Sequence, residues 1–398
     1  MYNRILVALD GSLYSDYAID ASLGIGKLQN KIQIIGCHVY ASELHRYRFT
    51  EMEDGLPERY QEEQKLEYLR DTHEDLITDG MKLISDAYLA PLTKKAEKEG
   101  MKISGVTPEG KHYVKFLEVA KNQKPDLIVL GAWGHGKDDE VSLGSFAQRV
   151  TIHTKESDLL IMKKPFIFKS RPIVVCIDGS TYSYNALEKA LQISKLFDTK
   201  VHLVAVYDPF FHLTVFKKIA DVLPEKDQER FNFTAQEILH DEIIDKGLEK
   251  IYEDYLKRGK LYAQSKDVEV NTKVLIGKAI SKIHQYASLN NASLLVIGRW
   301  GTHKDSISHI GSNTLNLLHK SFTNILIVSS EDKDLKIPEL VQEEQEELEW
   351  TPEALKKLER IPKFVHKMVI TTVENKAREK GLKKVTVELI EEVTPKGM

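Results

Sequence analysis

Apolar runs alternate with amphipathic stretches over most of the chain. The runs are short, rich in β-branched residues and almost continuous, which is typical of strands buried on both faces of a parallel sheet. They are ILVAL, KIQIIGCHVY, KISGV, LIVLG and LLIM in the first half, and IVVCI, KVHLVAVY, VNTKVLI, LLVIG and ILIV in the second. Helices are expected from near Ser15 and Ser183, and over about Pro57–Glu99 and Thr234–Lys260. This alternation predicts an α/β fold with helices on both faces of the sheet.

The same order of elements occurs twice. The segment Ile5–Ser12 (ILVALDGS) returns as Ile173–Ser180 (IVVCIDGS), and Pro125–Gly134 (PDLIVLGAWG) returns as Ala292–Gly301 (ASLLVIGRWG). A repeat of about 168 residues is a whole duplicated domain, because solenoid units are much shorter. The join is expected near KKPFIFKSRP, which carries two prolines and clustered positive charge.

The composition changes after Ser330. Acidic side chains dominate the next stretch, which predicts a solvated linker. From Trp350 a helical pattern resumes, in which Thr351 can cap a first helix and Gly381 can end a later one. Four parts are therefore expected: two open parallel-sheet domains at 1–166 and 167–330, an acidic linker at 331–349, and a small all-α module at 350–398.

The most informative motif follows the LIVLG and LLVIG runs. Both copies carry the spacing G-x2-G-x9-G-S, at Gly131, Gly134, Gly144 and Ser145 and again at Gly298, Gly301, Gly311 and Ser312. Glycines let the backbone approach an anion, can adopt φ > 0, and can turn successive N–H groups inward as an anion nest. A helix that begins at the Gly-Ser pair adds the positive end of its dipole, and the serine adds a hydroxyl donor. The motif predicts a phosphate site at the carboxyl ends of the strands.

The first two strands of each domain supply the rest of a nucleotide site. Asp10 and Asp178 each end a first strand just before Gly-Ser, where a carboxylate can accept bonds from a ribose hydroxyl or an adenine amine. Val39 and Val206 lie late in the second strands and would line the base. Two alternatives stay open: the aspartates can be helix N-caps, and the glycine loops can be tight turns without a ligand.

Together, VALDGS, VCIDGS and the two glycine loops resemble the universal stress protein family over roughly residues 1–330. The resemblance implies tandem domains of the adenine nucleotide alpha hydrolase-like, Rossmann-like fold. It implies ATP or AMP as ligand, with Mg²⁺ as an optional companion. The glycines and serine would hold phosphates, the strand-one aspartate the adenine or ribose, and a second-strand valine the base. Because domains of this family pair through their last strands, LLIM and ILIV are expected to form an internal pseudo-dimer; a homodimer is a further option.

Charge differs between the two loops. Acidic residues at 138–140 lie inside the first loop, where they would repel phosphate unless they point away or hold a divalent cation. The second loop has only Asp305, and Arg299 adds positive charge beside it. On this ground the second site is expected to bind nucleotide more tightly than the first.

Other side chains near the loops have two interpretations each. Trp133 and Trp300 precede the second loop glycine, where an indole can stack on the ligand or pack over the loop, and packing is the simpler role. Lys111 and Lys278 can reach a phosphate, but solvated helix starts are the simpler interpretation. The nearby histidines, His38, His112 and His135, show no metal-ligand spacing.

Charge and cysteine content limit the classes of binding partner and the cellular compartment that are expected. A net charge of -4 and a pI near 6.4 favour neither a nucleic-acid partner nor an anionic membrane. The two cysteines, Cys37 and Cys176, sit in apolar runs and make neither a disulfide framework nor a metal site. The first apolar run is too short for a signal peptide, and no stretch is long enough to span a bilayer, so a cytoplasmic protein is expected.

The C-terminal segment carries a second resemblance. WTPEA, the pattern I-P-x-F-V and the pattern E-N-K-A-R-x-K-G are similar to the small helical domain that ends a subunit of light-independent protochlorophyllide reductase. The segment has no cysteine to hold an iron–sulfur cluster, so the reductase activity is not expected. The resemblance implies a docking or ligand-sensing module for a protein partner; the alternative is a helical bundle that packs against the tandem.

The motifs argue against rapid catalysis. Neither a P-loop G-x4-G-K-[ST] nor a nucleophile elbow G-x-S-x-G occurs, and no acid and base are paired. The expected function is a stress-response regulator that binds ATP or AMP and changes shape or partners. A nucleotide-free scaffold, which recruits a partner through the linker and module, is the main alternative, and a slow ATPase is a third.

Overall fold

The computed structural model describes fifteen stretches of the chain, which are residues 1–29, 32–42, 47–48, 51–60, 62–137, 142–209, 218–219, 221–230, 245–302, 304, 309–329, 334–340, 348–359, 361 and 366–393. The acidic loop residues Asp138, Asp139, Glu140 and Asp305 lie outside them, as does most of the acidic linker. The chain divides into two compact units. The first comprises Met1–Val204, Gly259–Lys273 and Ile280–Ile337, and the second Ala205–Arg258, Val274–Ala279 and Pro338–Met398.

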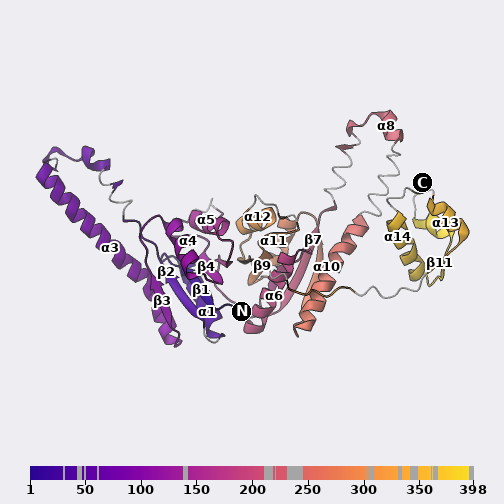
Figure 1. Cartoon of the computed structure of the whole chain (residues 1–398), viewed down its shortest axis with the longest axis horizontal. Coiled ribbons are helices and arrows are strands. Elements are labelled where there is room, and N and C mark those ends of the chain that lie inside the picture. Colours follow the sequence, from indigo (N-terminus) through magenta and orange to yellow (C-terminus); the bar gives the residue numbers. More distant parts are fainter. Residues whose placement is uncertain are drawn as a thin grey trace. The chain divides into compact units, whose positions relative to one another are not determined.

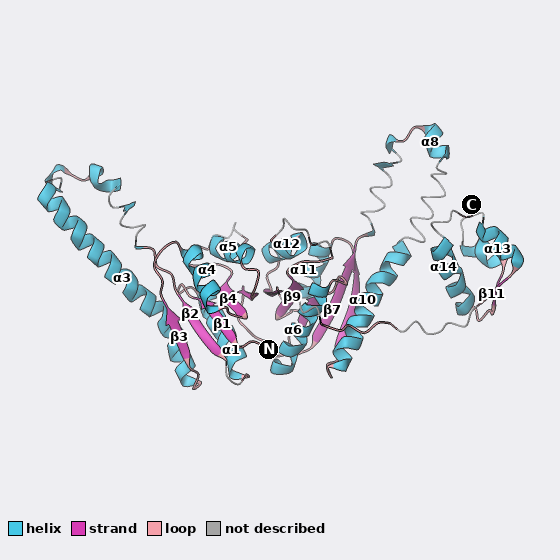
Figure 2. Cartoon of the chain, viewed as in Figure 1, coloured by secondary structure: helices cyan, strands magenta, loops and turns pink. Residues whose placement is uncertain are grey.

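The predicted strands form one ten-stranded sheet in the order β3-β2-β1-β4-β5-β10-β9-β6-β7-β8 (Figure 2). Their bounds are β1 Arg4–Ala8, β2 Gln33–Cys37, β3 Ile103–Val106, β4 Leu127–Gly131, β5 Asp158–Met162, β6 Ile173–Cys176, β7 Val201–Tyr207, β8 Val270–Ile276, β9 Leu294–Gly298 and β10 Asn324–Val328. Within the repeats β1 pairs in parallel with β2 and β4, β2 with β3, β4 with β5, β6 with β7 and β9, and β9 with β10; Leu6 lies opposite Ile128, and Val174 opposite Leu295. The α/β prediction is confirmed.

Helices fill the crossovers between parallel strands (Figure 1). They are α1 Leu13–Lys27, α3 Glu63–Lys98, α4 His112–Gln123, α5 Ser145–His153, α6 Thr181–Phe197, α8 Glu225–Arg230, α10 Asp245–Ser265, α11 Ala279–Leu289 and α12 Ser312–Lys320, with short 3-10 turns η1 Glu53–Gly55 and η2 Glu58–Tyr60 before α3. α1 packs on β1, β4 and β5, and α3 packs on β2 and β3. Because such crossovers are right-handed, α4 and α5 cover the opposite face.

The two repeats join through their last strands. β5 and β10 pair antiparallel, with Leu160 opposite Leu326 and Leu159 opposite Ile327. Every residue of both strands is buried. The predicted internal pairing of LLIM with ILIV is therefore confirmed. Without it, each edge strand would expose unpaired backbone groups and apolar side chains to solvent.

Two buried cations reinforce this junction. The Lys163 amine donates to the carbonyls of Leu318 and Ser321 at 2.5 Å each, at the end of α12. The Arg299 guanidinium donates through Nη2 to the carbonyls of Thr151 at 2.5 Å and Ile152 at 3.2 Å, in the last turn of α5. Carbonyls at a helix end lack intrahelical partners, so each repeat supplies a positive charge to a helix C-terminus of the other.

Lys163 should make stability depend on pH. Burial lowers its pKa from 10.5 to about 8. Between these values the unfolded chain binds more protons than the folded chain at this site, so the free energy of unfolding should rise with pH. The rise is at most about 3 kcal/mol. Urea denaturation at pH 7.5 and 10.5 should show that the free energy of unfolding of wild type rises relative to that of Lys163→Met. If the difference in unfolding free energy between the two proteins is the same at both pH values, the prediction is contradicted.

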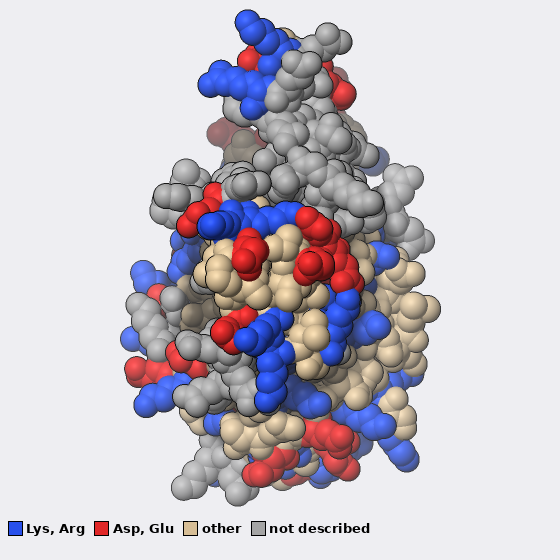
Figure 3. All heavy atoms as spheres, turned by 90° about the vertical axis from the view of Figure 1, so that its right-hand side faces the viewer, with Lys and Arg blue, Asp and Glu red and all other residues tan. Residues whose placement is uncertain are grey.

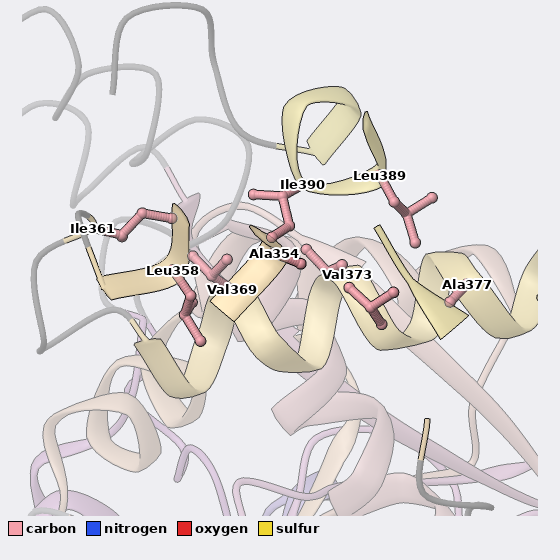
Figure 4. Packing of buried hydrophobic residues seen from close by; sticks show 9 residues of the cluster. Ala354, Leu358, Ile361, Val369, Val373, Ala377, Leu389 and Ile390 are labelled. Atoms are coloured by element: carbon pink, nitrogen blue, oxygen red, sulfur yellow. The ribbon is translucent and has the colours of Figure 1, made fainter. Parts of the chain in front are cut away.

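The C-terminal module lies in the second unit and has its own core. Its helices are α13 Pro352–Glu359, α14 His366–Glu379 and α15 Val387–Val393. Figure 4 shows apolar side chains from all three pointing toward one another, and they are Ala354, Leu358, Ile361, Val369, Val373, Ala377, Leu389 and Ile390, with Val385 also buried among them. Thr351 accepts a bond from the Ala354 amide at 3.3 Å, as its predicted capping role requires. Gly381 ends α14 at φ +66°.

The module is not purely helical, contrary to expectation. Two short strands, β11 Glu349–Trp350 and β12 Lys384–Val385, pair in parallel. Two-residue strands leave almost no periodicity to detect in a sequence. The residues before the module are also not simply solvated, since the Pro338 carbonyl accepts a bond from Arg258 Nε at 3.1 Å. Figure 3 shows charges of both signs mixed on the visible face, in line with ion pairs such as Lys357–Glu391.

No helix among the described stretches is long and apolar enough to cross a membrane.

Candidate functional site

The turn after each first strand is built around its aspartate. Asp10 Oδ1 accepts bonds from the Ser12 amide at 3.0 Å and the Ser12 hydroxyl at 2.6 Å. Ser12 in turn accepts from the Ser15 amide at 3.2 Å and is the N-cap of α1. Gly11 between them has φ +73°, a conformation that favours glycine. The aspartate therefore orders the turn, and the serine caps the helix.

The second repeat has the same turn. Asp178 Oδ1 accepts from the Ser180 amide at 3.0 Å and the hydroxyl at 2.5 Å, and Ser180 is the N-cap of α6. The alternative that Asp10 and Asp178 are the N-caps is wrong, and the helices begin two residues before the predicted Ser15 and Ser183. The serines compete better for the cap because they lie directly before the first helical residue.

The loop glycines are required by close packing. A Cβ on Gly131 would lie 2.6 Å from the Tyr14 Cβ, and one on Gly134 would lie 2.6 Å from Asp10 Oδ2. A Cβ on Gly144 would lie 3.0 Å from the Ala132 carbonyl oxygen. The expectation that these glycines use φ > 0 is wrong, since none is among the positive-φ glycines.

The second loop repeats these contacts. A Cβ on Gly298 would lie 2.8 Å from that of Tyr182, and one on Gly301 would lie 2.5 Å from Asp178 Oδ2. Gly311 is the N-cap of α12, which begins at Ser312. The duplication therefore preserves the packing as well as the motif.

The predicted nest of amides is smaller than expected. The Gly144 amide already donates to the Ala132 carbonyl at 2.8 Å, and the Gly311 amide donates to the Arg299 carbonyl at 2.9 Å. What remains for an anion is the first turn of each following helix, where Gly144 and Gly311 offer no side-chain cap. Ser145 and Ser312 open those helices, so the helix N-terminus is the better candidate for a phosphate ligand.

A cavity of about 660 Å³ opens at this edge of the first domain. Its volume is typical of a small-molecule site, roughly 300–1,000 Å³. All the residues predicted for this domain line it: Asp10, Val39, Gly131, Gly134, Gly144 and Ser145. The structure therefore brings together residues that are up to 135 positions apart in the sequence.

The described cavity wall carries more cationic than anionic side chains. Lys111 and Arg149 line it, together with three histidines, whereas Asp10 is the only carboxylate among the described lining residues. Burial lowers the pKa of His38 to about 4, with His112 adding to the effect and Asp10 opposing it. Burial also lowers the pKa of His112. Both imidazoles are thus neutral near pH 7 and can donate a hydrogen bond without a charge.

Aromatic rings form a further part of the wall. Trp133 lies 5.0 Å from Tyr14, centroid to centroid, and also lines the cavity. It therefore packs over the loop and borders the cavity, and its stacking on a ligand stays a prediction. Tyr88 reaches the cavity from α3 and meets His38 edge-on at 4.9 Å. Such a wall suits a flat, partly apolar ring.

Arg299 does not serve the second loop as predicted. Its side chain is fully buried, and its guanidinium donates to His309, Thr151 and Ile152 carbonyls at the domain junction. The guanidinium still lies over the Trp300 ring, 5.4 Å from its centroid, and the Lys304 amine lies 4.6 Å from the same centroid. Val206 lies half-buried in β7. The guanidinium is thus committed to backbone carbonyls, and its effect on ligand binding at the second site stays a prediction.

Several cavity residues were not predicted to be part of the site, although two of them were considered as metal ligands. His38 adjoins the predicted Val39, and His135 follows the predicted Gly134, with its Nε2 2.6 Å from the Asp10 carbonyl oxygen. Because both histidines are next to predicted site residues in the sequence, they could have been predicted to lie at the site. Tyr88 and Phe116 come from helices and carried no such signal. Among the described residues no group of His, Cys, Asp or Glu could hold a metal ion.

Comparison with known proteins agrees with this geometry. The profile of the universal stress protein family matches residues 1–161 and 169–329, and that of the proto-chlorophyllide reductase 57 kD subunit matches residues 350–393. A universal stress protein of Methanocaldococcus jannaschii is 35% identical over 91 residues, which are 23% of this chain and about half (53%) of the relative. One from Bacillus subtilis is 26% identical over 151 residues, 38% of this chain and 93% of the relative.

Solved structures show the same fold. A universal stress protein from Archaeoglobus fulgidus superposes with a TM-score of 0.52 at 17% identity, covering 83% of this chain and 97% of its own. A putative one from Pseudomonas aeruginosa gives 0.52 at 12% identity, covering 82% and 93%. The duplicated strand-turn-helix units, the paired last strands and the two profile matches lead to one assignment: the chain belongs to the universal stress protein family, as a tandem of two such domains followed by a proto-chlorophyllide reductase-type module.

Proposed function

We propose that the cavity of the first domain binds an adenine nucleotide, ATP or AMP, and that the chain is a nucleotide-dependent regulatory protein of the stress response. The observation that carries the proposal is the convergence of the strand-one aspartate, the second-strand valine and the glycine loop on one cavity that Lys111 and Arg149 also line. The domain limits at 1–166 and 167–330, and a protein partner for the module at 350–398, belong to the same proposal.

Each part of the nucleotide has a matching group in the cavity. Val39 is 5% exposed and offers an apolar surface for the base. The second oxygen of Asp10 is available to a ribose hydroxyl, since the first is occupied by Ser12. The amides of the first turn of α5 and the Ser145 hydroxyl would hold a phosphate, with Lys111 and Arg149 as countercharges.

The first domain is the better candidate for the tighter site. Its cavity carries Lys111 and Arg149, whereas the arginine expected to aid the second loop is committed to the domain junction. Asp178, Gly298, Gly301, Gly311 and Ser312 retain the local geometry, so the second repeat remains a weaker nucleotide site in this proposal.

Mass spectrometry of small molecules released from purified protein tests the proposal. ATP, ADP or AMP should be recovered, or should bind nucleotide-free protein in titration calorimetry. Parallel titrations with and without Mg²⁺ decide whether the cation takes part. A stripped protein that binds none of these nucleotides would instead favour a nucleotide-free scaffold, and Mg²⁺-dependent phosphate release would favour a slow ATPase.

A further inference from the structure

The helix α3 is much longer than its packing requires. It runs for 36 residues, about 54 Å, but its fully buried residues are Ser85, Leu92 and Ala96, all in the C-terminal part. That part packs on the sheet, where Leu89 and Leu92 lie against Gly36. Figure 1 shows the N-terminal half of α3 extending beyond the edge strand β3.

The extending half is braced and ordered. Arg70 forms a two-pronged ion pair with Glu53 of η1, with Nε to Oε1 at 2.8 Å and Nη2 to Oε2 at 2.7 Å. This contact ties the preceding segment to one face of the helix. Among the described residues, side chains on the opposite face of the helix are exposed.

That opposite face carries an apolar row. Tyr68 is 69% exposed, Leu76 is 67% exposed and Leu83 is 69% exposed. Thr72, Ala87 and Ala90 are exposed as well. In chain order the row is Tyr68, Thr72, Leu76, Leu83, Ala87 and Ala90, so successive members are three, four or seven residues apart. Such spacing places the row along one side of the helix over about 33 Å. Apolar rows of this length on a helix surface are typical of docking sites.

An acidic row runs beside it. Its members are all exposed, and they are Glu67, Asp71, Asp75, Asp79 and Asp86. Four of them directly precede a residue of the apolar row in the sequence, and Asp79 lies one helical turn after Asp75. Lys82 is the one cation in this row. Carboxylates four residues apart on a helix repel one another, so positive charge from outside would stabilise the row.

We infer that this outer face of α3 docks an amphipathic helix of a partner protein that carries a lysine or arginine row beside its apolar row. The charge pattern selects this occupant over the alternatives. In an antiparallel twofold pair of copies, the same flank of each helix faces its counterpart, so the acidic rows would oppose each other. Anionic lipid surfaces are disfavoured by the same charges.

The test uses two designed 24-residue peptides with the same leucine row, one with a flanking lysine row and one with glutamate in its place. Fluorescence anisotropy with the full chain should show the lysine peptide binding at least about tenfold more tightly, a preference that fades at high salt. Leu76→Ser/Leu83→Ser should weaken binding at least about tenfold. Asp71→Lys/Asp75→Lys should abolish the preference between the peptides, because the row then carries as many cations as carboxylates.

Leu289→Ser is the matched control, because Leu289 is 79% exposed on α11, outside the row. It should leave peptide binding unchanged, and circular dichroism should show all variants folded. Equal binding of both peptides, or no binding, would overturn the inference. So would self-association by sedimentation that Leu76→Ser/Leu83→Ser abolishes, or binding of phosphatidylcholine vesicles in place of peptide.

Discussion

Nucleotide-free protein should melt at a higher temperature when ATP or AMP is added. A ligand at a hundredfold excess over its dissociation constant stabilises the folded state by about 2.7 kcal/mol. For a domain of this size the melting temperature should rise by roughly 5 to 10 °C. Differential scanning fluorimetry with and without Mg²⁺ measures the shift. No shift with any adenine nucleotide would reject the proposed function.

The duplication supplies a matched pair of variants that assigns the shift to a domain. A methyl group on Gly134 would lie 2.6 Å from Asp10 Oδ2, and one on Gly301 would lie 2.5 Å from Asp178 Oδ2. Gly134→Ala and Gly301→Ala should therefore displace equivalent carboxylates and cost similar stability without ligand. Only Gly134→Ala should lose most of the nucleotide shift. Loss in Gly301→Ala alone would place the tighter site in the second repeat.

The strands were predictable because burial on both faces leaves a strong local signal. LIVLG coincides with β4, which is buried except at Gly131, whereas VNTKVLI coincides with the edge strand β8, although only Val270 of that strand is buried. Helix starts were less accurate, because Ser12 and Ser15 are both plausible caps and only the backbone geometry separates them. The two strands of the module were missed because β11 and β12 owe their pairing to contacts across the module and to no local pattern.

The site was predictable as far as it follows strand ends. In a parallel sheet the residues after β1, β2 and β4 meet at one edge, which is why Asp10, Val39 and Gly131 could be grouped from the sequence. Tyr88 could not be grouped with them, since it reaches the cavity from a helix whose register depends on its packing. The glycines were assigned to close approach of an anion and to φ > 0, whereas the structure shows that a Cβ would collide with Tyr14 and Asp10.

The hydrogen bonds of Arg299 could not be predicted from the sequence, because its partners Thr151 and Ile152 belong to the other repeat. Beside a glycine loop, an arginine suggests an anion site. Antiparallel pairing of β5 with β10 brings the end of α5 close to the second loop, and the guanidinium turns to those carbonyls. The equivalent residue in the first repeat is Ala132, so this contact has no counterpart to reveal it in the duplication.

Replacing Arg299 should therefore destabilise the junction between the repeats. Arg299→Met keeps much of the volume but leaves the carbonyls of His309, Thr151 and Ile152 without their donor. A buried group that loses a charged partner costs about 1 to 3 kcal/mol, so the loss across these acceptors should be about 3 kcal/mol or more. Urea denaturation measures it. Arg299→Lys is the control: it keeps the charge but lacks the planar fork, and should recover only part of the loss.

The same variant should weaken nucleotide binding from a distance. Arg299 holds the last turn of α5, and the first turn of α5 forms the proposed phosphate ligand. Freeing one end of a nine-residue helix lets its other end move relative to Asp10, so part of the binding free energy must restore that position. The nucleotide-induced shift in melting temperature should be smaller in Arg299→Met than in wild type, with Arg299→Lys between them. An unchanged shift in a clearly destabilised variant would show that the junction supports the fold alone and that the cavity is positioned without it.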